Sequence, residues 1–133
     1  MSKDQLLDFA ERYTAAWCSQ DAASVAAFYA PGGSLSVNEG APAVGRSAIA
    51  DVVQSYMTAF PDLRVILDEV TSRDGRTYYH WTLTGTYTGP GGTGRAVHIS
   101  GFECWCFGDD GLIASSQGRF DAAGYRRQLD PGA

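Results

Sequence analysis

The chain has 133 residues, 44% hydrophobic and 19% charged, which is enough for one compact domain (1–133) and too few for two domains with separate cores. Fifteen acidic against ten basic side chains give a net charge of −5, which argues against a nucleic-acid partner. No apolar run approaches the ~18 residues of a membrane span, so no membrane association is expected. A polar N-terminus without a signal peptide and an odd number of cysteines, three, predict a cytoplasmic protein.

The first half of the chain shows the three- and four-residue apolar spacing of helices. A first helix is expected behind a capping box of Ser2 and Gln5, and a short second helix behind Asp21. Ser47 is expected to cap a third helix that ends before Pro61. The apolar residues on the faces of these helices are Leu6, Phe9, Ala10, Tyr13, Trp17, Val25, Phe28, Tyr29, Ile49, Val52, Val53, Tyr56 and Phe60.

The second half is typical of antiparallel strands. Runs rich in Val, Ile, Thr, Tyr and Trp alternate with turn signals, of which residues 73–76 (RDGR) and 109–111 (DDG) are the clearest. Helices first and long strands afterwards predict an α+β fold, in which three N-terminal helices pack in a strongly curved, mainly antiparallel sheet. We expect strands at 34–38, 63–71, 77–88, 96–107 and 112–120, and a last short helix at 121–128.

Four segments carry a family resemblance: residues 60–64 (FPDLR), 81–89 (WTLTGTYTG) with the glycine-rich turn after it, 110–113 (DGLI) and 127–129 (RQL). They resemble the SnoaL-like polyketide cyclase family, a branch of the nuclear transport factor 2-like superfamily that also contains ketosteroid isomerase. The resemblance covers nearly the whole chain, from Leu6 to Leu129. It implies a cone-shaped α+β barrel with a pocket between the helices and the concave sheet face, and a homodimer through the convex face.

The family's catalytic pair does not carry over to this sequence. The cyclases use an aspartate on the last strand and a histidine on the neighbouring strand, and the resemblance places these two positions at Gly118 and Cys104. Glycine has no proton to move, and a neutral thiol is a poor replacement for imidazole. Asp121 takes the aspartate's role only if the alignment slips by one turn; its alternative role is to cap the last helix.

Strand alternation assigns the other candidates, because side chains two residues apart share a face. If position 104 faces the pocket, so does His98, the candidate catalytic acid or base; the alternative is a structural histidine at the rim. Glu103 and Arg119 then lie on the convex face, as an ion pair or a dimer contact. The predicted substrate-binding residues, which fit an ordinary core equally well, are Trp17, Tyr29, Val52, Tyr56, Phe102, Cys104, Gly118 and Phe120.

Neither a metal nor a cofactor is expected. Cys104 and Cys106 share a strand face, but the sequence offers no second pair at zinc-site spacing, and the glycine-rich stretch 89–94 lacks the lysine of a phosphate loop. We therefore expect a pocket for a small hydrophobic, oxygenated molecule, with cofactor-independent isomerase, dehydratase or cyclase chemistry. The alternatives are a non-catalytic ligand-binding or dimerisation module, and thiol chemistry at Cys104.

Overall fold

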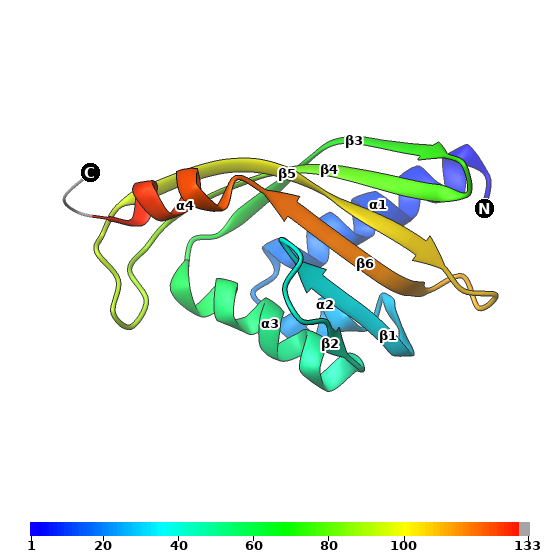
Figure 1. Cartoon of the computed structure of the whole chain (residues 1–133), viewed down its shortest axis with the longest axis horizontal. Coiled ribbons are helices and arrows are strands. Elements are labelled where there is room, and N and C mark those ends of the chain that lie inside the picture. The colour runs from blue at the N-terminus through cyan, green and yellow to red at the C-terminus, as the bar shows by residue number, and fades with distance from the viewer. Residues whose placement is uncertain (131–133) are drawn as a thin grey trace.

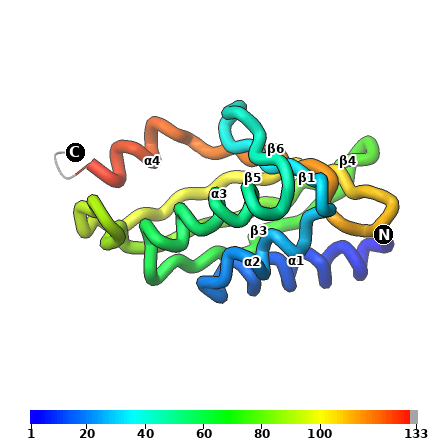
Figure 2. Tube along the Cα trace, turned by 90° about the horizontal axis from the view of Figure 1, so that it is seen from below, coloured from blue at the N-terminus to red at the C-terminus, as the bar shows by residue number. Residues whose placement is uncertain are grey.

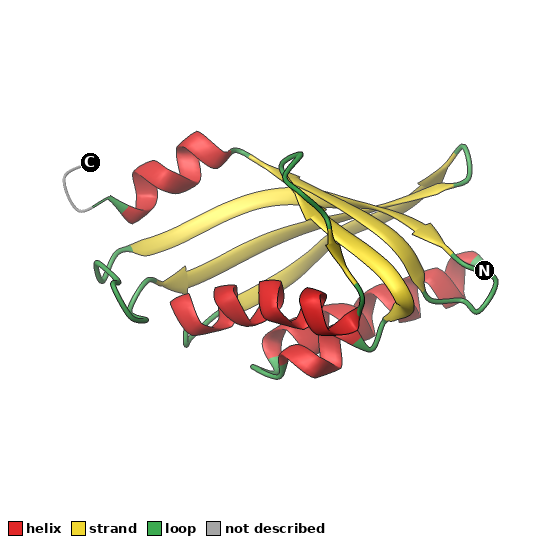
Figure 3. Ribbon diagram, turned by 60° about the horizontal axis from the view of Figure 1, so that its bottom comes forward, coloured by secondary structure: helices red, strands yellow, loops and turns green. Residues whose placement is uncertain are grey.

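A strongly curved sheet holds the structure together (Figures 1 and 3). The computed structural model describes residues 1–130, so positions 131–133 of the predicted domain lie outside the described residues. The sheet has the strand order β2-β1-β6-β5-β4-β3; β1 and β6 run parallel, and the other neighbours are antiparallel. The elements are α1 (Lys3–Cys18), α2 (Ala22–Ala26), β1 (Tyr29–Val37), β2 (Ala43–Val44), α3 (Arg46–Ala59), β3 (Arg64–Arg73), β4 (Arg76–Thr86), β5 (Ala96–Phe107), β6 (Ile113–Phe120) and α4 (Ala122–Leu129).

The helices α1, α2 and α3 cover the concave side of the sheet, and α2 contacts both of the others (Figures 2 and 3). This arrangement confirms the predicted α+β architecture with three N-terminal helices in a curved sheet. The fourth helix, α4, continues from the end of β6 and contacts β5. No helix among residues 1–130 is long and apolar enough to cross a membrane.

The predicted start of α1 is confirmed. The Ser2 hydroxyl accepts a hydrogen bond from the Gln5 backbone N–H at 3.1 Å, and the Gln5 side chain accepts one from the Ser2 N–H at 2.8 Å. Asp21 caps α2, as predicted, by accepting from the N–H of Ala23. The predicted Ser47 cap is wrong: the cap position lies two residues earlier, at Gly45, which makes no side-chain hydrogen bond, and α3 begins at Arg46.

The second helix is shorter than predicted. It ends at Ala26, and Tyr29 begins β1 instead of completing a helix face. The strand continues through Pro31, which has no backbone N–H to donate. The proline is tolerated there because the pairing of β1 with β6 is irregular between Tyr29 and Ser34, so no regular inter-strand hydrogen bond is lost. As a result, β1 starts five residues before the predicted strand at 34–38 and places the Tyr29 side chain in the core.

The hairpin between β5 and β6 contains a β-bulge. Cys106 pairs with Ser115, but Phe107 pairs with Ile113, so Ala114 is an extra residue on β6. Beyond such a bulge, the pairing between the two strands is shifted by one residue from the register of a regular hairpin. This one-residue shift decides which side chains of β5 reach the concave face.

The core lies between the concave face and the helices, and Trp105 is its central side chain. Trp105 is fully buried and stacks on Tyr79 with ring centroids 4.8 Å apart. Phe9 and Tyr13 of α1 meet the same indole edge-on, at 5.5 and 5.0 Å. Edge-to-face and offset-stacked contacts of this kind are the favourable aromatic geometries, so they hold β4 and β5 against α1.

Candidate functional site

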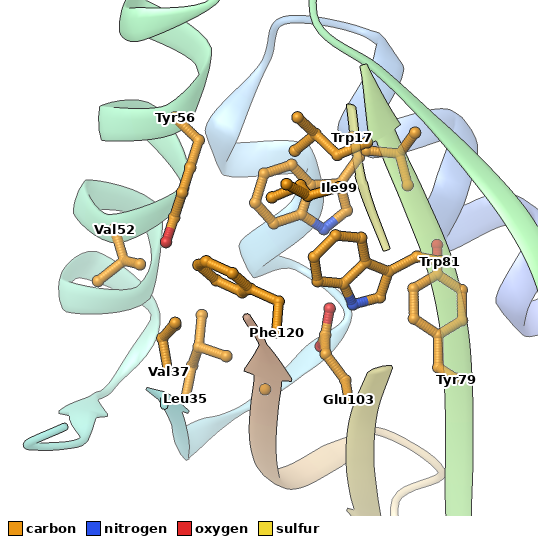
Figure 4. Close-up of a pocket in the computed structure, with 13 residues that line it drawn as sticks. Trp17, Leu35, Val37, Val52, Tyr56, Tyr79, Trp81, Ile99, Glu103 and Phe120 are labelled. Carbon is orange, nitrogen blue, oxygen red and sulfur yellow. The ribbon is translucent and has the colours of Figure 1, made fainter. Parts of the chain in front are cut away.

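A pocket opens between the concave face of the sheet and the helices α1 and α3 (Figure 4). It offers about 60 Å³ to the centres of water-sized molecules. Its walls are almost entirely apolar, and Glu103 is the single charged side chain among the described residues that line it. A lone carboxyl group in an apolar pocket is an arrangement that needs a physical explanation, because burial disfavours its charged form.

One wall of the pocket is an aromatic pair that meets over a glycine. Trp81 of β4 lies opposite Gly101 of β5, and Gly101 lies opposite Phe120 of β6. A Cβ atom on Gly101 would come within 2.8 Å of the Trp81 ring, so only glycine leaves room for the indole to cross β5. The Trp81 and Phe120 rings then contact each other edge-to-face, with centroids 6.0 Å apart.

Glu103 lies one row further along the same strands, where it is paired with Tyr79 on β4 and Gly118 on β6. Only 7% of the Glu103 surface is exposed. The missing side chain at Gly118 leaves space beside the carboxyl group, since a Cβ there would lie 3.8 Å from Cγ of Glu103. The carboxyl group points into the pocket (Figure 4).

Four neutral donors hold the carboxyl group, and they converge on one of its oxygens. Glu103 Oε1 accepts hydrogen bonds from Ser116 Oγ at 2.7 Å, Tyr13 Oη at 2.9 Å, Trp105 Nε1 at 3.0 Å and Tyr29 Oη at 3.3 Å. Oε2 receives only a second, 3.2 Å contact from Tyr13 Oη. No salt bridge within the described chain involves Glu103. Oε2 is therefore the oxygen with room for a proton.

Burial raises the pKa of Glu103 above the usual value of a glutamate, because the apolar surroundings penalise the carboxylate. The hydrogen bonds from Trp105, Ser116, Tyr13 and Tyr29 favour the carboxylate and act in the opposite direction, but burial is the larger effect. The same burial, reinforced by the nearby Glu103 charge, raises the pKa of Tyr13 and Tyr29, so both hydroxyls keep their protons. Glu103 is thus the group of this network placed to gain and lose a proton.

Two further polar side chains line the pocket. The Tyr56 hydroxyl comes from α3 and the Trp81 Nε1 from β4 (Figure 4). Within residues 1–130 neither group has a hydrogen-bond partner. Burial raises the pKa of Tyr56, so its hydroxyl is a neutral donor. Both groups are free to donate a hydrogen bond to a bound molecule.

The structure distributes the predicted substrate-binding residues over three places. Tyr29 lies beneath the pocket, with its hydroxyl on Glu103. Phe102 and Cys104 lie on the convex side of β5, and Phe102 packs there against Tyr78 and His80. The pocket itself is lined by the remaining five of these residues, Trp17, Val52, Tyr56, Gly118 and Phe120.

The predicted pocket face of β5 is wrong, and the bulge at Ala114 is the reason. A regular hairpin closed by the turn at 109–111 would place Phe102 opposite Gly118, whereas the bulge places Glu103 there. His98 is consequently exposed on the outer face, where its backbone N–H and C=O bond the side chain of Gln128 at 2.7 and 3.1 Å. The structure therefore leaves His98 outside the pocket.

The other acidic candidates have structural roles. Asp121 accepts a hydrogen bond from the Gly124 N–H at 3.0 Å and caps α4, which is the alternative that the sequence offered for it. Glu103 and Arg119 do not share the convex face as predicted: Glu103 lines the pocket, and Arg119 forms a salt bridge with Glu39 at 2.7 Å on the outer surface. Within residues 1–130, no cluster of His, Cys, Asp or Glu side chains is placed to hold a metal ion.

The sequence pattern of β5 indicates that Glu103 is buried, although the register expected from the turn at 109–111 indicates the opposite face. The residues that alternate with it on β5, Val97, Ile99, Trp105 and Phe107, are more apolar than the opposite set, which contains His98, Ser100 and Cys104. The apolar set of an amphipathic strand normally faces the core. A single glutamate within such a set indicates a buried carboxyl group.

Comparisons with known proteins agree with this architecture. The family model for the SnoaL-like domain matches residues 10–116, more than half of the chain. A candidate SnoaL-like polyketide cyclase from Jannaschia sp. CCS1 has a TM-score of 0.84 at 18% identity, covering 98% of this chain and 96% of that one. A hypothetical protein with a ketosteroid isomerase-like fold from Catenulispora acidiphila DSM 44928, solved in complex with trimethylamine, has a TM-score of 0.80 at 14% identity, covering 92% of each chain.

An NTF2-like protein of unknown function from Burkholderia pseudomallei K96243 is similar over 97% of this chain and 98% of that one, with a TM-score of 0.80 at 19% identity. The comparison with curated proteins finds no match. At these identities the solved structures show the fold alone, and they confirm the predicted cone-shaped α+β fold. The family match, which spans most of the helices and strands described above, shows that the chain belongs to the SnoaL-like domain family.

Proposed function

We propose that this SnoaL-like protein binds a small hydrophobic, oxygenated molecule and exchanges a proton with it through Glu103, without a cofactor. The observation that carries the proposal is the buried Glu103 carboxyl group, which faces an apolar pocket and is held by neutral donors alone. Environments of this kind, where burial shifts the pKa of a carboxyl group, are typical of acid–base sites.

The proton transfer starts from the ionised form of Glu103. Its Oε2 takes a proton from a carbon next to a carbonyl group of the bound molecule, and the C–H electron pair moves into the carbonyl group to form an enolate. The Trp81 Nε1, which lies beside the Glu103 carboxyl group, supplies a hydrogen bond to the oxygen that becomes negative, and the Tyr56 hydroxyl is a second donor on the pocket wall (Figure 4). Glu103 then returns the proton to the same carbon, or to another carbon in an isomerisation.

The position of Glu103 relative to Gly118 supports this role. The family resemblance places the cyclase aspartate at Gly118, and Glu103 lies directly opposite that position on the neighbouring strand. A Cβ atom at 118 would make only ordinary contacts, the nearest at 3.4 Å to the backbone oxygen of Ser36. The pocket therefore has a carboxyl group on β5 instead of β6, and a Cβ atom can be accommodated at position 118.

The test is deuterium exchange at the carbon next to the carbonyl of small ketones such as cyclohexanone, followed by proton NMR in D₂O. The wild-type protein is expected to accelerate the exchange, and Glu103→Gln is expected to lose about 100-fold or more of that acceleration. Glu69→Gln, at an exposed position on β3, is the matched control and should exchange at the wild-type rate. Full activity of Glu103→Gln would refute the proposal, and ketone binding without exchange would favour the non-catalytic binding module.

A second variant asks whether the carboxyl group can act from the neighbouring strand. Glu103→Gln combined with Gly118→Asp keeps one carboxyl group in the pocket and moves it to β6. We expect the double variant to exchange faster than Glu103→Gln alone, and slower than wild type because the four donors at Oε1 are aimed at position 103. A double variant no faster than Glu103→Gln would show that the carboxyl group works only within its hydrogen-bond network.

We also propose that the protein forms a homodimer through the convex face of the sheet. The support is a group of aromatic side chains on that face, in which the Phe102 ring lies 6.0 Å from the ring of Tyr78 and 5.8 Å from that of His80. Sedimentation velocity should give a dimer mass for wild type and a monomer mass for Phe102→Arg. A monomeric wild-type protein would contradict this assembly.

A further inference from the structure

We infer that the pocket takes a neutral molecule of about one ring that presents a hydrogen-bond acceptor, and that Trp81 sets this size limit. This inference deepens the proposed function and depends on it for the identity of the pocket. It follows from three properties of the site: its volume, the fixed position of the Trp81 indole, and the charges and donors along its walls.

The volume of the pocket favours small guests. About 60 Å³ is accessible to the centres of water-sized molecules. An engineered protein cavity that binds benzene measures ~150 Å³, and pockets for drug-sized ligands span about 300–1,000 Å³. Because the pocket opens to the surface, a single ring can enter with one edge toward Glu103 and the other toward the mouth. A second or third fused ring would have to extend toward the mouth or displace the aromatic wall.

Trp81 is the side chain that limits the space. Its indole crosses β5 in the room left by Gly101 and contacts the Phe120 ring edge-to-face. The edge that carries Nε1 points toward the part of the pocket where the Glu103 carboxyl group lies (Figure 4). Removal of the indole would join the space above Gly101 to the pocket, whereas removal of an aromatic side chain from the opposite face of β4 would not.

The walls favour a neutral guest with an acceptor. No basic side chain lines the pocket within the described residues, so a ligand carboxylate would find no counter-charge and would face Glu103. The Trp81 Nε1 is a donor only and needs an acceptor, which an ammonium group cannot provide. A carbonyl oxygen can accept from either the Trp81 Nε1 or the Tyr56 hydroxyl, and one bound to the Trp81 Nε1 lies beside the Glu103 carboxyl group (Figure 4).

The size limit is tested with three ketones of one, two and three rings: cyclohexanone, 1-tetralone and anthrone. We expect dissociation constants, measured by ligand-observed NMR or calorimetry, to rise about tenfold or more from one ring to three for wild type. Trp81→Ala, or Trp81→Leu if the alanine variant does not fold, should bind 1-tetralone about tenfold more tightly than wild type does. Tyr78→Ala, on the same strand but on the convex face, is the control and should keep the wild-type order.

The charge preference is tested with three ligands that share one ring: cyclohexanone, cyclohexanecarboxylate and cyclohexylammonium. At about pH 7 the ketone is expected to bind most tightly. Three results would each overturn the inference. The first is tighter binding of either charged ligand than of cyclohexanone, the second is tighter binding of anthrone than of cyclohexanone to wild type, and the third is no binding of cyclohexanone. These readouts measure affinity alone. If cyclohexanone binds and Glu103→Gln leaves its exchange rate unchanged, the proposed function fails while the size and charge preference stands.

Discussion

The two faces of β5 differ sharply although their residues alternate along one strand. Glu103 and Trp105 lie on the concave face, where both are buried and share a hydrogen bond. Phe102 lies on the convex face, half-buried beside Tyr78, and His98 is exposed. A single extra residue, Ala114 on the neighbouring strand, decides which set faces the pocket. The register of β5 with β6 therefore decides which side chains are buried in the pocket, and burial decides which of them can act as an acid or a base.

The same lesson holds for two of the acidic side chains. Glu103 is buried, and the apolar surroundings raise its pKa. Asp62 is at the surface, where its carboxyl group accepts hydrogen bonds from the Thr86 N–H at 2.7 Å and the Thr86 hydroxyl at 2.8 Å, and these bonds lower its pKa. Asp62 therefore releases its proton more readily than an ordinary carboxyl group, and Glu103 retains its proton to higher pH.

The largest expected effect concerns stability on the two faces. Trp105→Ala removes the central side chain of the core and one donor to Glu103, and we expect it to lower the free energy of unfolding by about 3–5 kcal/mol. Phe102→Ala, on the opposite face of the same strand, should cost about 1 kcal/mol because its ring is only half-buried. Urea unfolding of the two variants measures the difference. Equal losses would contradict the assignment of faces.

A smaller effect is expected in the pH dependence of stability. The pKa of Glu103 is higher in the folded chain than in the unfolded chain, so between the two values the folded state holds a proton that the unfolded state has lost. The Glu103 contribution is therefore fully present below the unfolded pKa and is lost as the pH rises through the folded pKa. One such proton changes the free energy of unfolding by at most about 1.4 kcal/mol per pH unit.

Glu103→Gln removes this contribution, because an amide has almost the same shape and does not titrate. Denaturant unfolding at a series of pH values should show the variant gaining stability relative to wild type as the pH rises above the range of an ordinary glutamate. A constant difference between the two proteins over the whole series would mean that the pKa of Glu103 is the same in the folded and unfolded states.

The smallest effect is expected at Ser116, whose hydroxyl is the closest donor to Glu103 Oε1, at 2.7 Å. This hydrogen bond favours the carboxylate, so Ser116→Ala should raise the pKa of Glu103 further and move the pH profile of ketone exchange toward higher pH. The stability cost of the lost hydrogen bond is about 1 kcal/mol. Ser115→Ala, the neighbouring position on the other face, should leave the profile unchanged; a matching shift there would remove Ser116 from the network.

Much of the fold was predictable because its signals are local. The capping box of Ser2 and Gln5, the cap at Asp21 and the turn at Asp74 and Gly75 all form between residues close in the chain. The bounds of β5 are as predicted, since a long run of alternating β-formers ends in clear turn residues. The early start of β1 was not predictable in this way, because that strand depends on pairing with the distant β6.

The site was harder to predict because it depends on register. Five of the predicted substrate-binding residues, from α1, α3 and β6, line the pocket, but the face of β5 was inverted. Ala114 carries no sequence mark of a bulge, since it has neither the glycine nor the unusual backbone preference of a turn. The apolar residues that alternate with Glu103 on β5 indicate the observed face, whereas the register expected for a regular hairpin indicates the opposite face.

The most direct test of the account is the pKa of the Glu103 carboxyl group. Carbon-13 NMR of protein labelled at the glutamate side chains follows each carboxyl carbon with pH, and Glu103→Gln assigns the signal by its loss. The account predicts a midpoint for Glu103 above that of the exposed Glu69, with a further rise in Ser116→Ala. A midpoint at or below that of Glu69 would contradict the claim that burial in the pocket keeps this carboxyl group protonated to higher pH.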